Sequence, residues 1–279
     1  MRRASDPLLH RLVDDAALFP PGNAPMDVAL AEHARHLEAP WADAVGPFLC
    51  PASRVDELVA RLPADATLRL SIVFDVVGEG AHAALRAVAA DDGLTLAGVE
   101  ASLASLGDDA AAVGANLARL PDSVGYLEVP RTEVEAALDV VGTTGWHAAK
   151  YRTGGVTADA FPTEAELAAF LLACTSRDIP FKLTAGLHRA VRNSSDEGFE
   201  QHGVLNVLVA TRVAQTGGSV DAVVAALSER RPKQLVGFVQ AWDNATCAGV
   251  RTAFRSFGCC GVTDPLGDLA ALGVLEDLR

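Results

Sequence analysis

Two lysines, Lys150 and Lys182, lie in short apolar segments that are typical of β-strands, at residues 148–152 and 181–184. Each segment runs directly into a turn that contains threonine and glycine. Alternate side chains of a strand share a face, so each lysine can point away from the face that covering helices occupy. We therefore expect two amines to project from neighbouring strands near the ends where ligands bind in such folds. The other interpretation is a pair of solvated lysines.

An amphipathic helix is expected between these two segments. Thr163 and Glu164 follow Pro162 and provide a helix start signal. Apolar residues then recur at the spacing of one buried helical face, at Leu167, Phe170, Leu171 and Cys174. A strand, a helix and a second strand in this order require a parallel pair joined by a right-handed crossover.

Three acidic residues end preceding strand-like segments. Leu68–Asp75, Leu94–Glu100 and Gly125–Val129 are apolar and rich in β-formers, and alternation turns Asp75, Glu100 and Glu128 inward. The inward set at the carboxyl ends of five successive strands is then Asp75, Glu100, Glu128, Lys150, Arg152, Lys182 and Thr184. Buried charges need partners, so this set either forms a closed salt-bridge network or binds a ligand.

Strand and helix signals alternate along the chain with short connections. Counting Ala16–Phe19 as the first strand and Ser256–Val262 as the last gives eight β-α units. This arrangement predicts one (β/α)8 (TIM) barrel domain over residues 1–279, with a helical insertion at about 219–254. Leu235–Gln240 could alternatively be a strand, which would shift the register or open the sheet. A helix is expected from about Asp108 to Leu120.

Composition narrows the class of protein. A net charge of −13 opposes nucleic-acid binding, which depends on Lys and Arg at phosphates. The sequence contains no uncharged apolar run long enough to predict a membrane span. Charged residues interrupt the first apolar residues of the chain, so we expect no signal peptide. Five cysteines without a C-x-x-C motif oppose a disulfide framework and a zinc ribbon. We expect a cytoplasmic protein with a small-molecule substrate, and a homo-oligomer is an open alternative.

The motifs K-Y-R-T-G-G and K-L-T-A-G-L-H-R resemble the paired lysine strands of deoxyribose-phosphate aldolase, a class I aldolase with K-T-S-T-G and K-A-S-G-G on strands six and seven. The resemblance covers about 45 residues and implies that Lys150 forms a Schiff base, Lys182 depresses its pKa, and Glu100 assists proton transfer. It implies no cofactor. The segment F-G-C-C-G-V-T-D-P departs from the family's phosphate-binding loops, so a phosphorylated substrate is not carried over.

Two other functions stay open. Asp75, Glu100 and Glu128, with a lysine base on strand six, are similar to the magnesium site and base of the enolase superfamily, so Mg²⁺ is the alternative cofactor. A non-catalytic binding barrel is the second alternative. The contacts of the lysines discriminate among these functions, because direct pairing with Glu100 or Glu128 would oppose catalysis by a neutral amine.

Further candidates follow the second lysine strand. Three arginines, Arg152, Arg189 and Arg192, could hold an anion or a carboxylate, because arginine suits bidentate recognition. His188 and His202 flank a polar loop that reads as a lid or binding loop. Either histidine could act as a general acid or base, or the pair could bind a transition metal.

Overall fold

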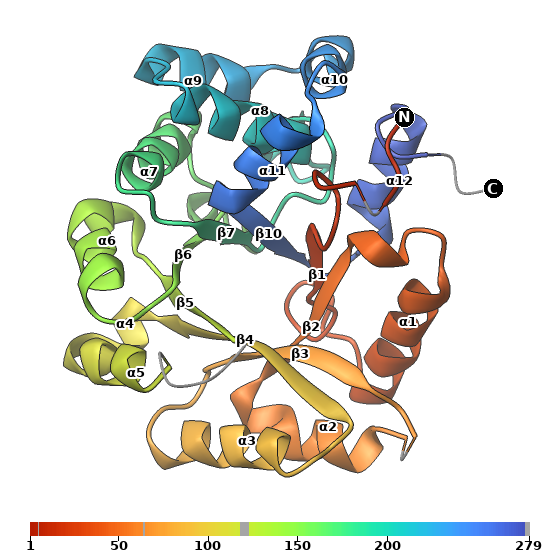
Figure 1. Cartoon of the computed structure of the whole chain (residues 1–279), viewed down its shortest axis with the longest axis vertical. Helices are drawn as coiled ribbons and strands as arrows, with labels where there is room; N and C mark the ends of the chain where they lie inside the picture. Colours follow the sequence, from red (N-terminus) through yellow and green to blue (C-terminus); the bar gives the residue numbers. More distant parts are fainter. Residues whose placement is uncertain (5, 64, 118–122, 277–279) are drawn as a thin grey trace.

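The computed structural model describes residues 1–276 except 5, 64 and 118–122. Within these residues, eight parallel strands close into a barrel in the order β1-β10-β7-β6-β5-β4-β3-β2, with helices around the outside (Figure 1). The barrel strands are β1 (Val13–Asp15), β2 (Val45–Pro51), β3 (Leu68–Val73), β4 (Leu94–Ser102), β5 (Val124–Glu128), β6 (Ala148–Arg152), β7 (Phe181–Thr184) and β10 (Phe254–Cys259). The predicted (β/α)8 barrel is confirmed.

The helices follow the strands along the chain. They are α1 (Met26–Glu38), α2 (Val55–Arg61), α3 (Glu79–Ala89), α4 (Leu103–Leu106), α5 (Ala110–Leu117), α6 (Val134–Thr143), α7 (Glu164–Ser176), α8 (Val204–Gln215), α9 (Val220–Ser228), α10 (Pro232–Gln240), α11 (Asn244–Ala253) and α12 (Thr263–Ala271). The stretch before the last strand is therefore helical, and residues 235–240 belong to α10. The predicted end of α5 at Leu120 lies outside the described residues.

The unit β6-α7-β7 forms as its sequence pattern predicts. Thr163 is the N-cap of α7, and its side chain and that of Glu166 form a reciprocal capping box. The apolar face of α7 is fully buried, and the Phe170 ring stacks on Tyr151 of β6 at 4.3 Å between ring centroids. In the parallel pairing of the two strands, Lys150 is directly opposite Lys182.

The predicted first strand was wrong by a few residues. Val13–Asp15 forms β1, whereas residues 16–19 form the loop that follows it. Two consecutive acids are poor strand formers, but Asp15 lies 2.9 Å from His33 of α1 and Asp14 lies inside the barrel, so tertiary contacts override the local preference. The last strand, β10, likewise begins and ends earlier than the predicted Ser256–Val262.

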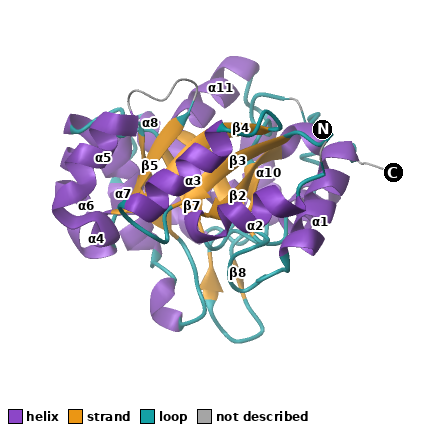
Figure 2. Ribbon diagram, turned by 90° about the horizontal axis from the view of Figure 1, so that it is seen from below, coloured by secondary structure: helices purple, strands orange, loops and turns teal. Residues whose placement is uncertain are grey.

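The two ends of the described chain lie together, because Arg2 forms a parallel bridge with Leu275 (Figure 1). A two-stranded hairpin, β8 (Asn193–Ser194) and β9 (Glu200–Gln201), projects beyond the barrel at the end where the loops after the strands gather (Figure 2). No helix among the described residues is long and apolar enough to span a membrane.

Candidate functional site at the carboxyl end of the barrel

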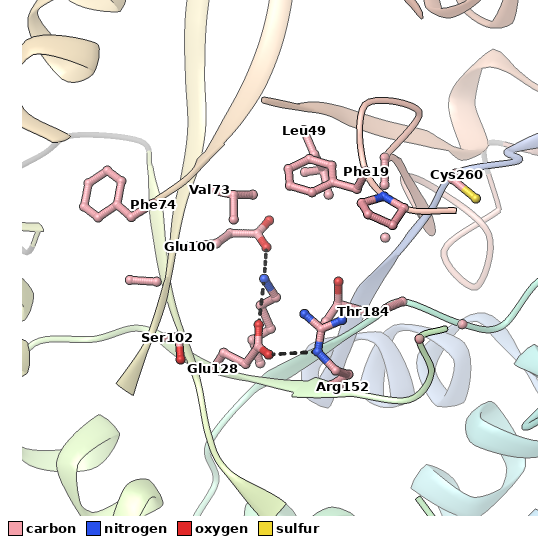
Figure 3. Close-up of a pocket in the computed structure, with 18 of the residues that line it drawn as sticks. Phe19, Leu49, Val73, Phe74, Glu100, Ser102, Glu128, Arg152, Thr184 and Cys260 are labelled. Atoms are coloured by element: carbon pink, nitrogen blue, oxygen red, sulfur yellow. Dashed lines mark hydrogen bonds and ion pairs between the residues drawn. The ribbon is translucent and has the colours of Figure 1, made fainter. Parts of the chain in front are cut away.

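A pocket of about 480 Å³ opens at the carboxyl ends of the strands. Six of the residues predicted for a site line it, namely Glu100, Glu128, Lys150, Arg152, Thr184 and His188. Aromatic and aliphatic side chains, including Phe19, Leu49 and Phe74, line the remaining wall (Figure 3). The pocket thus has a charged side and an apolar side, which is the composition of a small-molecule site.

The charged side is built around the Lys150 ammonium group. Its Nζ lies 3.0 Å from Glu100 Oε2 and 3.1 Å from Glu128 Oε2, and Glu128 in turn contacts Arg152 Nε at 3.3 Å (Figure 3). The Lys150 side chain is only 5 % exposed. Each of the two carboxylates therefore contacts the ammonium group directly at the wall of the pocket.

Lys182 lies deeper in the barrel and completes the network. Its Nζ donates to Glu100 Oε1 and to Asp14 Oδ2, both at 2.6 Å. Ser256 donates to Asp14 at 2.8 Å, and Ser71 donates to Glu100 at 3.2 Å. Glu100, which is fully buried, consequently bridges the two lysines.

The ion pairs set the charge states of these groups. Burial alone would raise the pKa of Glu100, but the two ammonium groups outweigh it and hold that pKa at about 2. Burial alone would lower the pKa of Lys150, but Glu100 and Glu128 outweigh it and raise the pKa above its ordinary value. Asp14 and Glu100 raise the pKa of Lys182 in the same way against burial. Both lysines are therefore charged at neutral pH.

Two carboxylate oxygens in this network, Asp14 Oδ1 and Glu100 Oε2, lack a hydrogen bond from the described residues. Glu100 Oε2 is buried and accepts none from any residue that the structure describes, because the contact with Lys150 has the distance of an ion pair without hydrogen-bond geometry. Buried polar atoms are almost always satisfied, by protein, water or ligand. Glu100 lines the pocket, so this oxygen is a candidate acceptor for a bound molecule.

The Thr and Gly turns after β6 and β7 shape the rim by close backbone contact. Thr153 N donates to Thr184 O at 2.9 Å. A Cβ atom at Gly154 would lie 2.2 Å from the carbonyl oxygen of Ala185, so only glycine permits this approach. Ala185 itself has a φ of 57°, a strained value for a residue with a side chain, and it lines the pocket.

The structure does not bring Asp75 to the pocket. β3 ends at Val73 and the chain turns, so alternation no longer applies, and the exposed Asp75 accepts hydrogen bonds from Ser53 N and Oγ. Glu100 and Glu128 share Lys150 as a partner. The three carboxylates of the magnesium alternative therefore do not converge. Among the described residues, no group of three His, Cys, Asp or Glu side chains is placed to hold a metal ion.

Three other predicted residues also lie outside the pocket lining. Arg192 is buried between Glu164 at 2.7 Å and Glu200 at 3.1 Å. His202 lies 2.8 Å from the carbonyl oxygen of Pro162 and 3.4 Å from Arg192. These contacts fasten the β8-β9 hairpin to the start of α7. The third of these residues, Arg189, is exposed, and its Nη1 lies 3.6 Å from Asp268 Oδ1.

His188 reaches the pocket beside two thiols. Its Nδ1 lies 3.5 Å from Cys259 Sγ, and its Nε2 lies 3.9 Å from Cys260 Sγ. Cys260 lines the pocket with His188, whereas Cys259 is buried. Burial raises the pKa of both thiols, so neither is prepared as a thiolate.

Sequence reasoning missed Asp14 and Ser256. Asp14 was overlooked because the first strand was predicted to begin after it. The sequence V-D-D lies in an apolar context, and alternation along a strand there would already have turned one of the two aspartates inward. A second missed signal is composition, since the chain has three lysines in all and the third is the exposed Lys233. Two of three lysines inside the barrel is far from the usual preference of lysine for the surface.

No protein-family model matches this chain, and a search of curated proteins finds no similar sequence.

Proposed function

We propose that the chain is an enzyme that transfers protons next to the carbonyl group of a small metabolite, with Lys150 as the cationic group and Glu128 as the base. One observation carries this proposal: Lys150 and the two carboxylates that keep it charged line the same pocket. A charged ammonium in a site of low dielectric stabilises a developing oxyanion, which is the main requirement of enolisation.

The proton-transfer step needs only these groups. Glu128 takes a proton from the carbon beside the carbonyl, and the electron pair of that C–H bond forms the C=C bond of an enolate. The negative charge moves to the carbonyl oxygen, which accepts a hydrogen bond from Lys150 Nζ. Return of the proton from Glu128 to the same carbon completes an exchange. If that carbon also carries a hydroxyl group, a proton delivered to the former carbonyl carbon, with the hydroxyl proton transferred to the enolate oxygen, makes the hydroxyl oxygen the new carbonyl and completes an isomerisation. If the next carbon carries a leaving group, that group departs with its bonding electrons as the carbonyl re-forms, and the reaction is that of a lyase.

The walls indicate the substrate class. The Arg152 side chain is 49 % exposed and contacts Glu128 through Nε, so its terminal nitrogens can hold a carboxylate. The apolar part of the lining, which includes Phe19, Leu49 and Phe74, suits a short apolar group. We therefore infer a small carbonyl compound that also carries a carboxylate, such as an oxo acid.

Loss of carbon-bound protons in D2O tests this proposal. We expect proton NMR to show enzyme-dependent exchange in at least one compound from a panel of small oxo acids and hydroxy ketones. Lys150→Met and Glu128→Gln should each slow the exchange strongly, whereas Lys233→Met, which removes the exposed lysine, should retain it. Compounds that bind and raise the melting temperature without any exchange would instead support a non-catalytic binding barrel.

Schiff-base catalysis at Lys150, as in the aldolase resemblance, is the second candidate. Lys182 lies directly opposite Lys150 in the strand pairing, and its positive charge by itself acts to lower the pKa of Lys150, which favours this mechanism. The carboxylates act in the other direction, so an amine nucleophile would first have to pass its proton to Glu128. Borohydride trapping with the same panel separates the candidates, because a reduced adduct on Lys150 requires the Schiff base and proton transfer alone leaves none.

A further inference from the structure

A second pocket, of about 370 Å³, opens at the opposite end of the barrel, where the strands begin. Four arginines line it, and they come from separate segments: Arg11 before β1, Arg69 on β3, Arg251 on α11 and Arg255 on β10. In a chain with a net charge of −13, this concentration of positive charge is opposite to the overall balance.

The four guanidinium groups have no acidic partner among the described residues. Arg251 donates only to backbone carbonyls, among them Leu8 at 2.8 Å and His10 at 2.9 Å. Arg11, Arg69 and Arg255 form no side-chain hydrogen bond or ion pair with any described residue. Arginines outside this pocket commonly do pair with acids, as Arg192 does with Glu164 at 2.7 Å.

The one acid in the lining does not neutralise them. Asp14 also lines this pocket, but its Oδ2 already accepts from Lys182 at 2.6 Å and from Ser256 at 2.8 Å. Burial, followed by the neighbouring Arg11, lowers the pKa of Arg69, and burial lowers the pKa of Arg251 to about 10. Like charges therefore stand in one partly desolvated pocket, an arrangement that a bound anion would stabilise.

We propose that this pocket binds a small anion with at least two negative charges, a phosphate ester or a polycarboxylate, between Arg11, Arg69 and Arg255. Guanidinium groups match the geometry of both oxyanions through paired N–H donors. The volume of the pocket and the strongly acidic remainder of the chain favour a small molecule over a nucleic acid.

This site is separate from the proposed catalytic pocket and does not rest on the proposed function. A chain of contacts links the two pockets, because Asp14 and Lys182 line the arginine pocket and Lys182 shares Glu100 with Lys150. An anion bound among the arginines can thus alter the charge balance around Lys150 without contacting it.

Calorimetric titration with pyrophosphate and, separately, with citrate tests the site at an ionic strength matched with NaCl. We expect one anion per chain for at least one of the two probes, and the tighter probe assigns the ligand class. Arg69→Gln/Arg255→Gln should weaken binding about a hundredfold, because each substitution removes charge-assisted hydrogen bonds. The single change Arg11→Gln, at an exposed position, gives a second test should the double variant fail to fold.

The matched control is Arg35→Gln/Arg61→Gln, which removes the same charge from exposed positions on α1 and α2 and should bind as the parent does. Equal weakening in this control would reduce the effect to net charge and overturn the proposal. Loss of binding in Arg152→Gln, with binding retained in Arg69→Gln/Arg255→Gln, would place the anion in the pocket at the carboxyl ends of the strands. That result would also overturn the proposal. If neither pyrophosphate nor citrate binds, the proposal is also overturned.

Discussion

Replacement of Lys182 by methionine should destabilise the protein strongly. Lys182 is 1 % exposed and is the partner of two buried carboxylates, Asp14 and Glu100. Methionine has a similar length and no charge, so the substitution removes the ammonium group while keeping most of the volume. Asp14 would then keep only the hydrogen bond from Ser256, and Glu100 would keep Lys150 and Ser71.

The magnitude follows from the charge states. The pKa of Glu100 falls from an ordinary 4.5 to about 2 in the folded chain, and this difference corresponds to about 3 kcal/mol at neutral pH. Breaking a buried ion pair by removing one partner costs about 3–5 kcal/mol in general. We therefore expect Lys182→Met to lower the free energy of unfolding by about 3–5 kcal/mol, a large part of a typical total of about 5–15 kcal/mol.

Urea unfolding at pH 7 and at pH 4 measures this effect. The stability that Glu100 gains from its lysines is present above its unfolded pKa and is lost as the pH falls from 4.5 toward 2. In the variant the buried acids can take up protons at higher pH, so the difference between variant and parent should shrink at pH 4. Lys233→Met, at an exposed position, is the matched control and should change stability little.

A midpoint for Lys182→Met that equals that of the control at pH 7 would refute the reasoning. So would a difference that grows toward pH 4, because it would mean that the variant's acids stay charged without Lys182.

Three further outcomes follow from the same contacts. Glu128→Gln should leave the fold intact and reduce proton exchange in a responsive substrate by about 10²–10⁴-fold, which NMR rates would measure; a change within twofold would remove Glu128 from the proposed mechanism. Asp14→Asn should lower the melting temperature in calorimetry by leaving Lys182 with Glu100 alone, and Asp27→Asn on the exposed side of α1 provides the comparison; equal melting temperatures would contradict the buried pair. Added MgCl2 should not raise the melting temperature above an ionic-strength control, since Asp75 is directed to Ser53; a specific rise would return the site to the metal-assisted alternative.

The paired strands around Lys150 and Lys182 could be predicted because their alternation and the helix between them follow regular periods. Alternation also placed Glu100 and Glu128 correctly, since both lie within the regular part of their strands. It failed for Asp75, where β3 had already ended. The alternation of side chains between the two faces of a strand predicts their direction only where the backbone is extended.

Other features depend on contacts distant in sequence. β1 contains two adjacent acids, and only the pairing of Asp14 with Lys182 and of Asp15 with His33 makes such a strand stable. Arg192 and His202 lie in a segment without a period, so nothing in their spacing distinguishes a structural anchor from a binding group. The charge state of Lys150 likewise depends on two carboxylates from different strands.

Titration of the lysine side chains is the most direct test of the central claim that Lys150 is a charged group in the pocket. With ¹⁵N at the lysine Nζ positions, the chain's three lysines should give at most three signals, assigned by Lys150→Met, Lys182→Met and Lys233→Met. Glu100 and Glu128 raise the pKa of Lys150, so its signal should remain that of an ammonium group above pH 10.5, the ordinary pKa of a lysine. Titration of Lys150 below this ordinary value, toward neutral pH, would contradict the account and favour an amine nucleophile.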